Sequence, residues 1–333
     1  MQSQLQSQSQ SQSQYLTRKP KLKMQHWIKL IRPINLVLLV ATMYFIDAFI
    51  LQPNFNTYGI TFTLTEFQFF LLVLSTVLIC GAGYIINDYY DVEIDAINKP
   101  QKQIIGKLIS QKKAFTAYLV LSGLGLAIGI YLSLEIEFWK LSTLFVIAIF
   151  LLYFYSASFK RTPLLGNIIV AFLAGLSILL ILFFEPSLYR LARPADYFIA
   201  GMVTKYLIGI SVFAFALTVV REVVKTMEDV EGDQQMGANT IAVKWGMNVS
   251  KVISVIFILF TITALLYILM QVLNRDNKIY FYYLNALNLF LLFIAFKIYS
   301  AKTKNDYTFI STLIKVAMVV GICIMPLYYI LEF

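Results

Sequence analysis

Long, nearly uncharged apolar runs recur along the whole chain, and they leave few architectures open to it. Each run approaches the roughly 20 residues that an α-helix needs to cross a bilayer. A membrane β-barrel would instead have short segments in which apolar and polar residues alternate. The runs therefore predict an all-α, multi-pass membrane protein with nine transmembrane helices. They lie at 34–51, 67–86, 114–134, 140–156, 165–184, 199–219, 252–273, 279–299 and 309–331.

The composition agrees with a membrane protein and excludes two other classes. Of the 333 residues 59% are hydrophobic and only 14% are charged, whereas about a quarter are charged in a soluble domain. A disordered chain is excluded by the same numbers. The single histidine, His26, and the two cysteines, Cys80 and Cys323, also exclude a Ser-His-Asp triad and a Cys-rich metal site.

The distribution of charge predicts the domain organisation and the orientation in the membrane. Residues 1–23 combine a Gln/Ser repeat with basic residues, and we expect a disordered tail before a single transmembrane domain at 24–333. Twenty lysines and arginines lie on the side of the N-terminus, against five on the other side. This bias predicts a cytoplasmic N-terminus. Contact with membrane lipids accounts for the net charge of +9 without nucleic acid. No obligate protein partner is evident.

Acidic residues are concentrated at two span ends on the predicted cytoplasmic side. Nine of the 18 acids lie in the windows 88–95 and 222–233. If the second span continues as a helix, its window presents one stripe of oxygen donors, since residues three and four apart share a helical face. In the other window, Asp229 and Asp233 form a second pair on one face. The stripe comprises Asn87, Asp88, Asp91 and Asp95.

Clustered carboxylates near a bilayer repel one another and require a counter-charge. Because the ligands are oxygens, without histidine or cysteine, they favour Mg²⁺, which completes its shell with waters and substrate phosphates. Cations interleaved with the acids suit a polyanionic, metal-bound ligand such as a diphosphate. These cations are Lys99, Lys102, Lys107, Lys160, Arg161, Arg221 and Lys225, of which Lys102, Lys160, Arg221 and Lys225 are the substrate-binding candidates.

Both acidic windows resemble motifs of the UbiA superfamily of intramembrane prenyltransferases. N-D-Y-Y-D-V-E-I-D at 87–95 matches the N-D-x-x-D-x-x-x-D motif of the family, and D-V-E-G-D at 229–233 matches its D-x-x-x-D motif. Further similar strings are I-R-P-I-N at 31–35, K-R-T-P-L-L-G-N at 160–167 and G-A-N-T-I-A-V at 237–243. The resemblance implies helices around a central cavity that opens toward the cytoplasm.

The resemblance also implies a reaction, the transfer of a prenyl group from a prenyl diphosphate to a lipid or aromatic acceptor. Asn87, Asp88, Asp91 and Asp95 would face one Mg²⁺, and Asp229 and Asp233 the other. Asn35 would line the acceptor or metal region. Lys160, Lys225 and Lys102 would hold the diphosphate, and Arg221 is a further substrate-binding candidate. Position 102 carries lysine where arginine is usual, and Thr226 replaces an aspartate that many members have.

Three functions remain open at this point. E-D-V-E-G-D followed by G-x-x-T is most similar to enzymes that add geranylgeranyl to geranylgeranylglyceryl phosphate. Homogentisate prenyltransferases share much of these strings, so an aromatic acceptor (homogentisate or 4-hydroxybenzoate) is the alternative. A cation-coupled transporter could also carry acids in its spans, although it would place them at mid-membrane. A phosphotransferase that acts on CDP-alcohols is not supported, because the chain has no D-G dipeptide.

Overall fold

The computed structural model describes residues 24–98, 101, 103–189, 194–272 and 278–333. The predicted disordered tail at 1–23 and Lys102 therefore lie outside the described residues. Within these ranges every regular element is a helix, and nine segments are long and apolar enough to cross a membrane. This confirms the predicted architecture. Six spans are single helices: α5 (Glu66–Tyr90), α7 (Gln111–Glu135), α9 (Leu165–Phe184), α10 (Pro194–Glu228), α13 (Gly246–Val272) and α14 (Lys278–Ser300).

The other three spans are composite, and proline explains two of the interruptions. Pro53 and Pro326 cannot donate a hydrogen bond to the carbonyls of Phe49 and Ile322, so the regular helix is broken near each of them. The first span consists of α3 (Pro33–Ile46), the π-helical turn η1 (Asp47–Leu51) and α4 (Gln52–Tyr58). The fourth consists of the 3-10 turn η2 (Trp139–Leu141) and α8 (Ser142–Ala157), and the ninth of α15 (Lys304–Ile322) and α16 (Ile324–Glu332).

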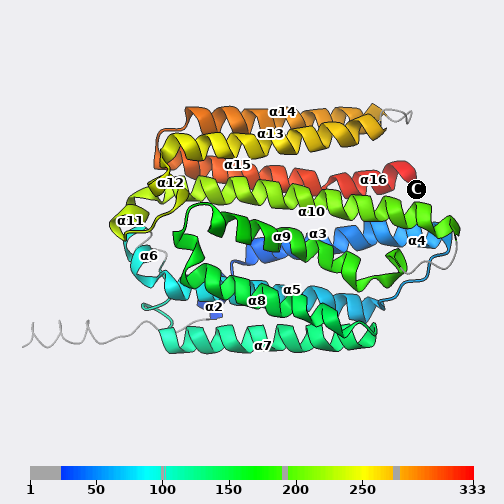
Figure 1. Cartoon of the computed structure of the whole chain (residues 1–333), viewed down its shortest axis with the longest axis horizontal. Coiled ribbons are helices and arrows are strands. Elements are labelled where there is room, and N and C mark those ends of the chain that lie inside the picture. Colours follow the sequence, from blue (N-terminus) through cyan, green and yellow to red (C-terminus); the bar gives the residue numbers. More distant parts are fainter. Residues whose placement is uncertain (1–23, 99–100, 102, 190–193, 273–277) are drawn as a thin grey trace, which may run out of the picture.

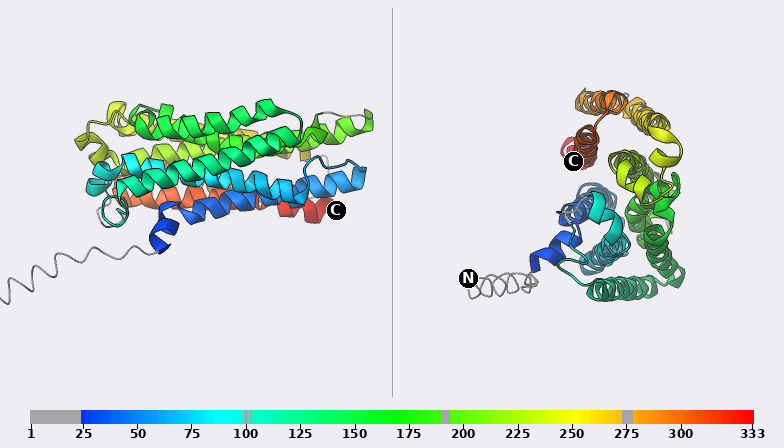
Figure 2. Two further views of the ribbon diagram at one scale, coloured as in Figure 1. Left: turned by 90° about the horizontal axis from the view of Figure 1, so that it is seen from below. Right: turned by 90° about the vertical axis from the view of Figure 1, so that its left-hand side faces the viewer.

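The spans run side by side along the long axis of the molecule (Figure 1, Figure 2). Neighbours in sequence pack side by side, as α5 does against α7 and α8, and α10 against α9 and α13. Contacts of α3 with α15 and α16 bring the first and last spans together. The buried side chains form two large apolar clusters, one around α3, α5 and α9 and one around α10, α13, α14 and α15.

Short elements cover one end of the bundle, which we call the motif end because both acidic motifs lie there (Figure 1). The sixth span differs from the prediction, since α10 continues nine residues beyond 219 and ends at Glu228. Its polar last turns line an internal cavity instead of forming a solvent loop. The other elements of this end are α2 (Met24–Leu30), α6 (Val92–Asn98), η3 (Phe159–Arg161), α11 (Val230–Gln235) and α12 (Ile241–Lys244).

Candidate active site

A cavity of about 1030 Å³ extends from the motif end into the membrane-spanning part of the bundle. Charged side chains line its outer part. Its inner part is lined by apolar residues such as Leu39, Leu144, Phe145, Leu180 and Ile210. Such a cavity can hold a ligand that has an ionic head and a long apolar tail.

Every predicted site residue within the described ranges lines this one cavity, although the candidates come from four separate stretches of the chain. The structure thus brings the two acidic motifs and the predicted cations together, while Lys102 lies outside the described residues. These lining residues are Asn35, Asn87, Asp88, Asp91, Asp95, Lys160, Arg221, Lys225, Asp229 and Asp233.

The two acidic motifs have nearly the same backbone geometry. A long span helix ends just before Asp91 (φ −95°, ψ 7°) and another just before Asp229 (φ −99°, ψ 9°). A short helix follows in each case and carries Asp95 or Asp233. The helical register is kept, since the amide of Asp95 donates to the carbonyl of Asp91 at 2.8 Å and that of Asp233 to Asp229 at 3.1 Å. The acids of each motif therefore remain on one face, as predicted, although the motif spans the end of one helix and the start of the next. The two short helices, α6 and α11, contact each other.

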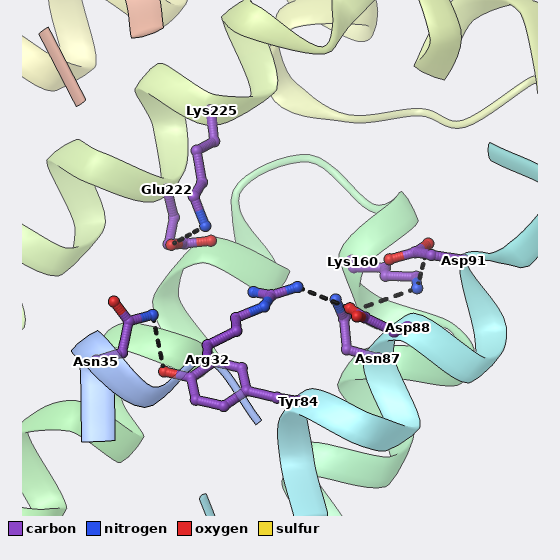
Figure 3. A network of polar contacts seen from close by, with 9 residues as sticks. All are labelled: Arg32, Asn35, Tyr84, Asn87, Asp88, Asp91, Lys160, Glu222 and Lys225. Atoms are coloured by element: carbon purple, nitrogen blue, oxygen red, sulfur yellow. Dashed lines mark hydrogen bonds and ion pairs between the residues drawn. The ribbon is translucent and has the colours of Figure 1, made fainter. Parts of the chain in front are cut away.

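Two cations neutralise the first motif (Figure 3). Arg32 donates to Asp88 at 2.8 Å, and Lys160 donates to Asp91 at 2.6 Å and to Asn87 at 3.5 Å. Arg32 also stacks over the ring of Tyr84 at 4.9 Å, and the hydroxyl of Tyr84 accepts from Asn35 at 3.2 Å. This network explains why the I-R-P-I-N string and the first acidic motif occur together.

Burial and ion pairing oppose each other in these two cations. Burial lowers the pKa of Lys160 below its ordinary value, and the adjacent Asp91 carboxylate offsets only part of that effect. Burial also lowers the pKa of Arg32, but the Asp88 carboxylate together with Tyr84 and Glu222 raises it by more, so the pKa of Arg32 is raised overall. Arg32 therefore remains charged at any physiological pH.

The position of Lys160 depends on a glycine. Gly166 is the second residue of α9 and packs against the turn η3. A Cβ at this position would lie 2.8 Å from both the Cα of Lys160 and the carbonyl oxygen of Phe159. These neighbours are backbone atoms, so a side chain could be accepted only if the turn moved. Glycine at 166 thus lets the K-R-T-P-L-L-G-N segment fold back and direct Lys160 into the cavity.

In the second acidic window, Glu222 binds two cations and a loop contacts Asp233. Glu222 is 8% exposed and accepts from Arg221 at 2.6 Å and from Lys225 at 3.2 Å. The hydroxyl of Thr240 donates to Asp233 at 3.1 Å. Gly237, at φ +66°, allows the turn that brings the loop back under α11. The G-A-N-T segment therefore orients the Asp233 carboxylate.

Sequence reasoning did not assign site roles to Arg32 and Glu222. In the sequence alone Arg32 adds only to the excess of lysine and arginine near the N-terminus, although its place before Pro33 in the I-R-P-I-N string is a usable signal. Glu222 was a weaker candidate than the aspartates, and its burial between two cations depends on the tertiary structure. Lys315, an isolated charge within an apolar span, also lines the cavity.

The donor set fits Mg²⁺, provided that a ligand completes the coordination. Within the described ranges, no group of three His, Cys, Asp or Glu side chains converges closely enough to hold a metal unaided. The oxygen donors instead lie on two adjacent walls of one cavity. Mg²⁺ commonly binds one or two carboxylates and takes its remaining ligands from water and substrate phosphates. A diphosphate between the walls would supply these oxygens.

Comparison with known proteins identifies the family. Residues 55–315 match the UbiA prenyltransferase family. A digeranylgeranylglyceryl phosphate synthase of Methanothermobacter thermautotrophicus is 33% identical over 238 residues, which cover 71% of this chain and 72% of that protein. The chain belongs to the UbiA prenyltransferase family. It is therefore a prenyltransferase and an integral membrane protein, and the transporter interpretation is set aside.

Solved structures agree with this fold at lower sequence identity. One, described as a digeranylgeranylglyceryl phosphate synthase in membranes, has a TM-score of 0.62 and 19% identity and covers 92% of this chain and 98% of its own. Another, a UbiA homologue from Archaeoglobus fulgidus bound to GPP and Mg²⁺, has a TM-score of 0.55 and 16% identity, with coverage of 90% and 99%.

Proposed function

We propose that this UbiA family member transfers a geranylgeranyl group from geranylgeranyl diphosphate to geranylgeranylglyceryl phosphate, with Mg²⁺ as cofactor, and releases diphosphate. The observation that carries the proposal is one cavity whose polar end holds both aspartate motifs and whose interior is apolar. The name of the relative from Methanothermobacter thermautotrophicus supports this acceptor.

The polar end would bind the diphosphate head. Lys160 and Lys225 are the cations that we assign to its oxygens, together with Lys102 by its place in the sequence after the first motif. The oxygen donors of the two motifs (Asn87, Asp88, Asp91, Asp95, Asp229 and Asp233) would hold Mg²⁺. When bound, Mg²⁺ would neutralise the charge that develops on the leaving diphosphate.

Lys160 and Arg32 form ion pairs with Asp91 and Asp88. A bound diphosphate offers Lys160 a second anionic partner, so the ion pairs keep the cations in place before binding. These side chains then lose their conformational entropy during folding, so that binding of the diphosphate does not have to order them. Thr240 fixes the Asp233 carboxylate in the same way.

The apolar interior would bind the tail and exclude water from the reacting carbon. Cavity-lining residues on α9 extend from Gly166 to Leu180, about 21 Å along the helix. Each buried CH₂ contributes about 0.8 kcal/mol, so a long prenyl chain gains ample affinity there. Exclusion of water protects the allylic cation that forms as the C1–O bond breaks.

The bond changes are simple. The electron pair of the C1–O bond leaves with the diphosphate. The oxygen of the acceptor hydroxyl forms the new bond to C1 and loses its proton to the aqueous end of the cavity. No redox step is required.

The test is transfer of labelled geranylgeranyl in membranes that contain this chain. Geranylgeranylglyceryl phosphate, homogentisate and 4-hydroxybenzoate are offered separately, each with Mg²⁺ or with EDTA. We expect Mg²⁺-dependent labelling of the glyceryl phosphate ether. Labelling of an aromatic acceptor in its place would overturn the acceptor assignment, and labelling in the presence of EDTA would overturn the metal assignment.

A further inference from the structure

Lys315 is a charged residue in an unusual place. It lies on α15 among apolar residues, where a lysine is costly unless an anion or water meets it. It lines the cavity together with Met318 and Ile322, which occupy the same helical face at spacings of three and seven. Lys315 is therefore the polar member of an otherwise apolar strip that faces the ligand space.

Lys315 forms no hydrogen bond or ion pair with any residue that the structure describes. The basic side chains of the two motif regions behave differently, since Arg32, Lys160 and Lys225 each contact a carboxylate. An ammonium group without a protein partner, directed into a cavity, is a recognition element for an anionic ligand.

The depth of Lys315 can be read from the neighbouring helix. α15 packs antiparallel to α10 (Figure 1), and Thr308 donates to Glu228 at 2.9 Å. Lys315 lies seven residues beyond Thr308 on α15, and Arg221 lies seven residues before Glu228 on α10. Each is therefore about 10 Å further into the bundle than this contact. The charges that act on Lys315 are those of Arg221 and Arg32 and, with the opposite sign, those of Glu222 and Glu228. Both cations therefore lie about two turns inward of Asp229 along these two helices.

Arg221 also retains an unused donor. Its Nη1 contacts Glu222, but its Nε is buried and has no hydrogen-bond partner among the described residues. The side chain as a whole is only 13% exposed. A buried guanidinium N–H without a partner is unfavourable, and an anion at this level would satisfy it.

We propose that Lys315 and Arg221 form a subsite for the phosphate of the acceptor, directly next to the diphosphate site at the motif end, since Arg221 and Lys225 share the Glu222 carboxylate. This inference rests on the proposed function for the statement that the acceptor is a phosphate monoester. In geranylgeranylglyceryl phosphate the reacting hydroxyl and the phosphate are on adjacent carbons. When the hydroxyl meets C1 of the donor, the phosphate must therefore lie at the boundary between the polar and apolar parts of the cavity. Two anions held so close together need separate cations.

The first test separates the two substrates kinetically. Lys315→Met should raise the KM for geranylgeranylglyceryl phosphate roughly tenfold to a hundredfold, the effect of losing a charge-assisted hydrogen bond. The KM for the donor should change less than twofold, and Lys315→Arg should restore most of the affinity. Lys205→Met is the matched control, because Lys205 also lies within a span but is exposed and does not line the cavity. Equal KM values for Lys315→Met and the control would overturn the subsite.

A binding measurement keeps the subsite testable even if the proposed reaction fails. Without donor, geranylgeranylglyceryl phosphate should raise the melting temperature of the wild type and of Lys205→Met, but not of Lys315→Met. Geranylgeranylglycerol, which lacks the phosphate, should shift all three equally. Equal stabilisation of Lys315→Met by the ester would overturn the inference. Protection by inorganic phosphate alone, at the same concentration as the ester, would reassign the site to free phosphate. Absence of transfer by the wild type would contradict only the proposed function.

Discussion

At the scale of single residues, Asp91 and Asp229 stand out because they occupy equivalent places. Each lies at the break between a span helix and a short helix, and each lines the cavity. A carboxylate at such a position adjoins the helix on either side of it. The other acids of each motif lie at other positions and project their carboxylates in other directions, so they cannot take over the role of Asp91 or Asp229.

Asp91→Asn and Asp229→Asn should each lower the rate of transfer by roughly a hundredfold or more, because each removes a charge that would hold the metal and diphosphate. The melting temperature of Asp229→Asn should change little, since asparagine has the same shape, whereas Asp91→Asn should lower it because the substitution leaves Lys160 without its carboxylate partner. Glu231→Gln is the control, because Glu231 belongs to the second motif but is exposed. If either aspartate variant retains full activity, the metal assignment is wrong.

At the scale of elements, the turn η3 depends on the start of α9. Lys160 projects from this turn, and Gly166 lies against the backbone of the turn. Asn239 strengthens the arrangement, because its amide donates to the carbonyl of Arg161 at 2.9 Å. The loop before α12 thus ties the fourth-to-fifth connection to the second acidic motif.

Gly166→Ala should displace Lys160 and raise the KM for the prenyl diphosphate, because the added Cβ meets backbone atoms at 2.8 Å. We expect an increase of about tenfold, the loss of one charge-assisted contact. Gly123→Ala is the control, since no atom lies within 4 Å of a Cβ built at that helical position. Indistinguishable kinetics for the two alanine variants would show that the turn does not position Lys160.

At the scale of the whole molecule, the bundle determines how long a tail the cavity can hold. Phe145 of α8 lines the inner part of the cavity and is 1% exposed. Its ring packs edge-on against Phe184 at 5.6 Å and lies close to Gly129 of α7, where a Cβ would be only 2.4 Å from the ring. Three spans thus fix one wall of the tail site.

Phe145→Ala should enlarge the inner cavity and shift the preference toward a prenyl diphosphate one isoprene unit longer. The ratio of transfer rates for the C25 and C20 donors is the measure. The variant should also be less stable, by about 3–5 kcal/mol as in other aromatic-to-alanine core substitutions, which thermal unfolding in detergent would detect. An unchanged ratio in folded protein would exclude Phe145 as a determinant of tail length.

The orientation in the membrane is a property of the whole molecule. With the nine spans found among the described residues, the two ends of the chain are expected on opposite sides of the membrane, and the excess of lysine and arginine predicts a cytoplasmic N-terminus. Alkaline phosphatase fused after Phe333 should be active in a bacterial host, whereas green fluorescent protein fused there should be dark. The opposite pattern would contradict the predicted orientation.

The sequence by itself determined the number of spans, the two acidic motifs and their place at span ends. These features depend on local quantities, namely run length, helical spacing and charge, which do not require knowledge of neighbouring helices. The limits of α10 were less predictable, because its polar last turns face a cavity and not solvent.

Only the tertiary structure decided which distant residues meet. Arg32 pairs with Asp88, Glu222 is enclosed by Arg221 and Lys225, and Lys315 reaches the same cavity from the last span. Helical periodicity gives the face on which a side chain lies but not the helix opposite to it. An isolated lysine in an apolar run therefore carried no meaning until the packing of α15 against α10 placed it beside the ligand space.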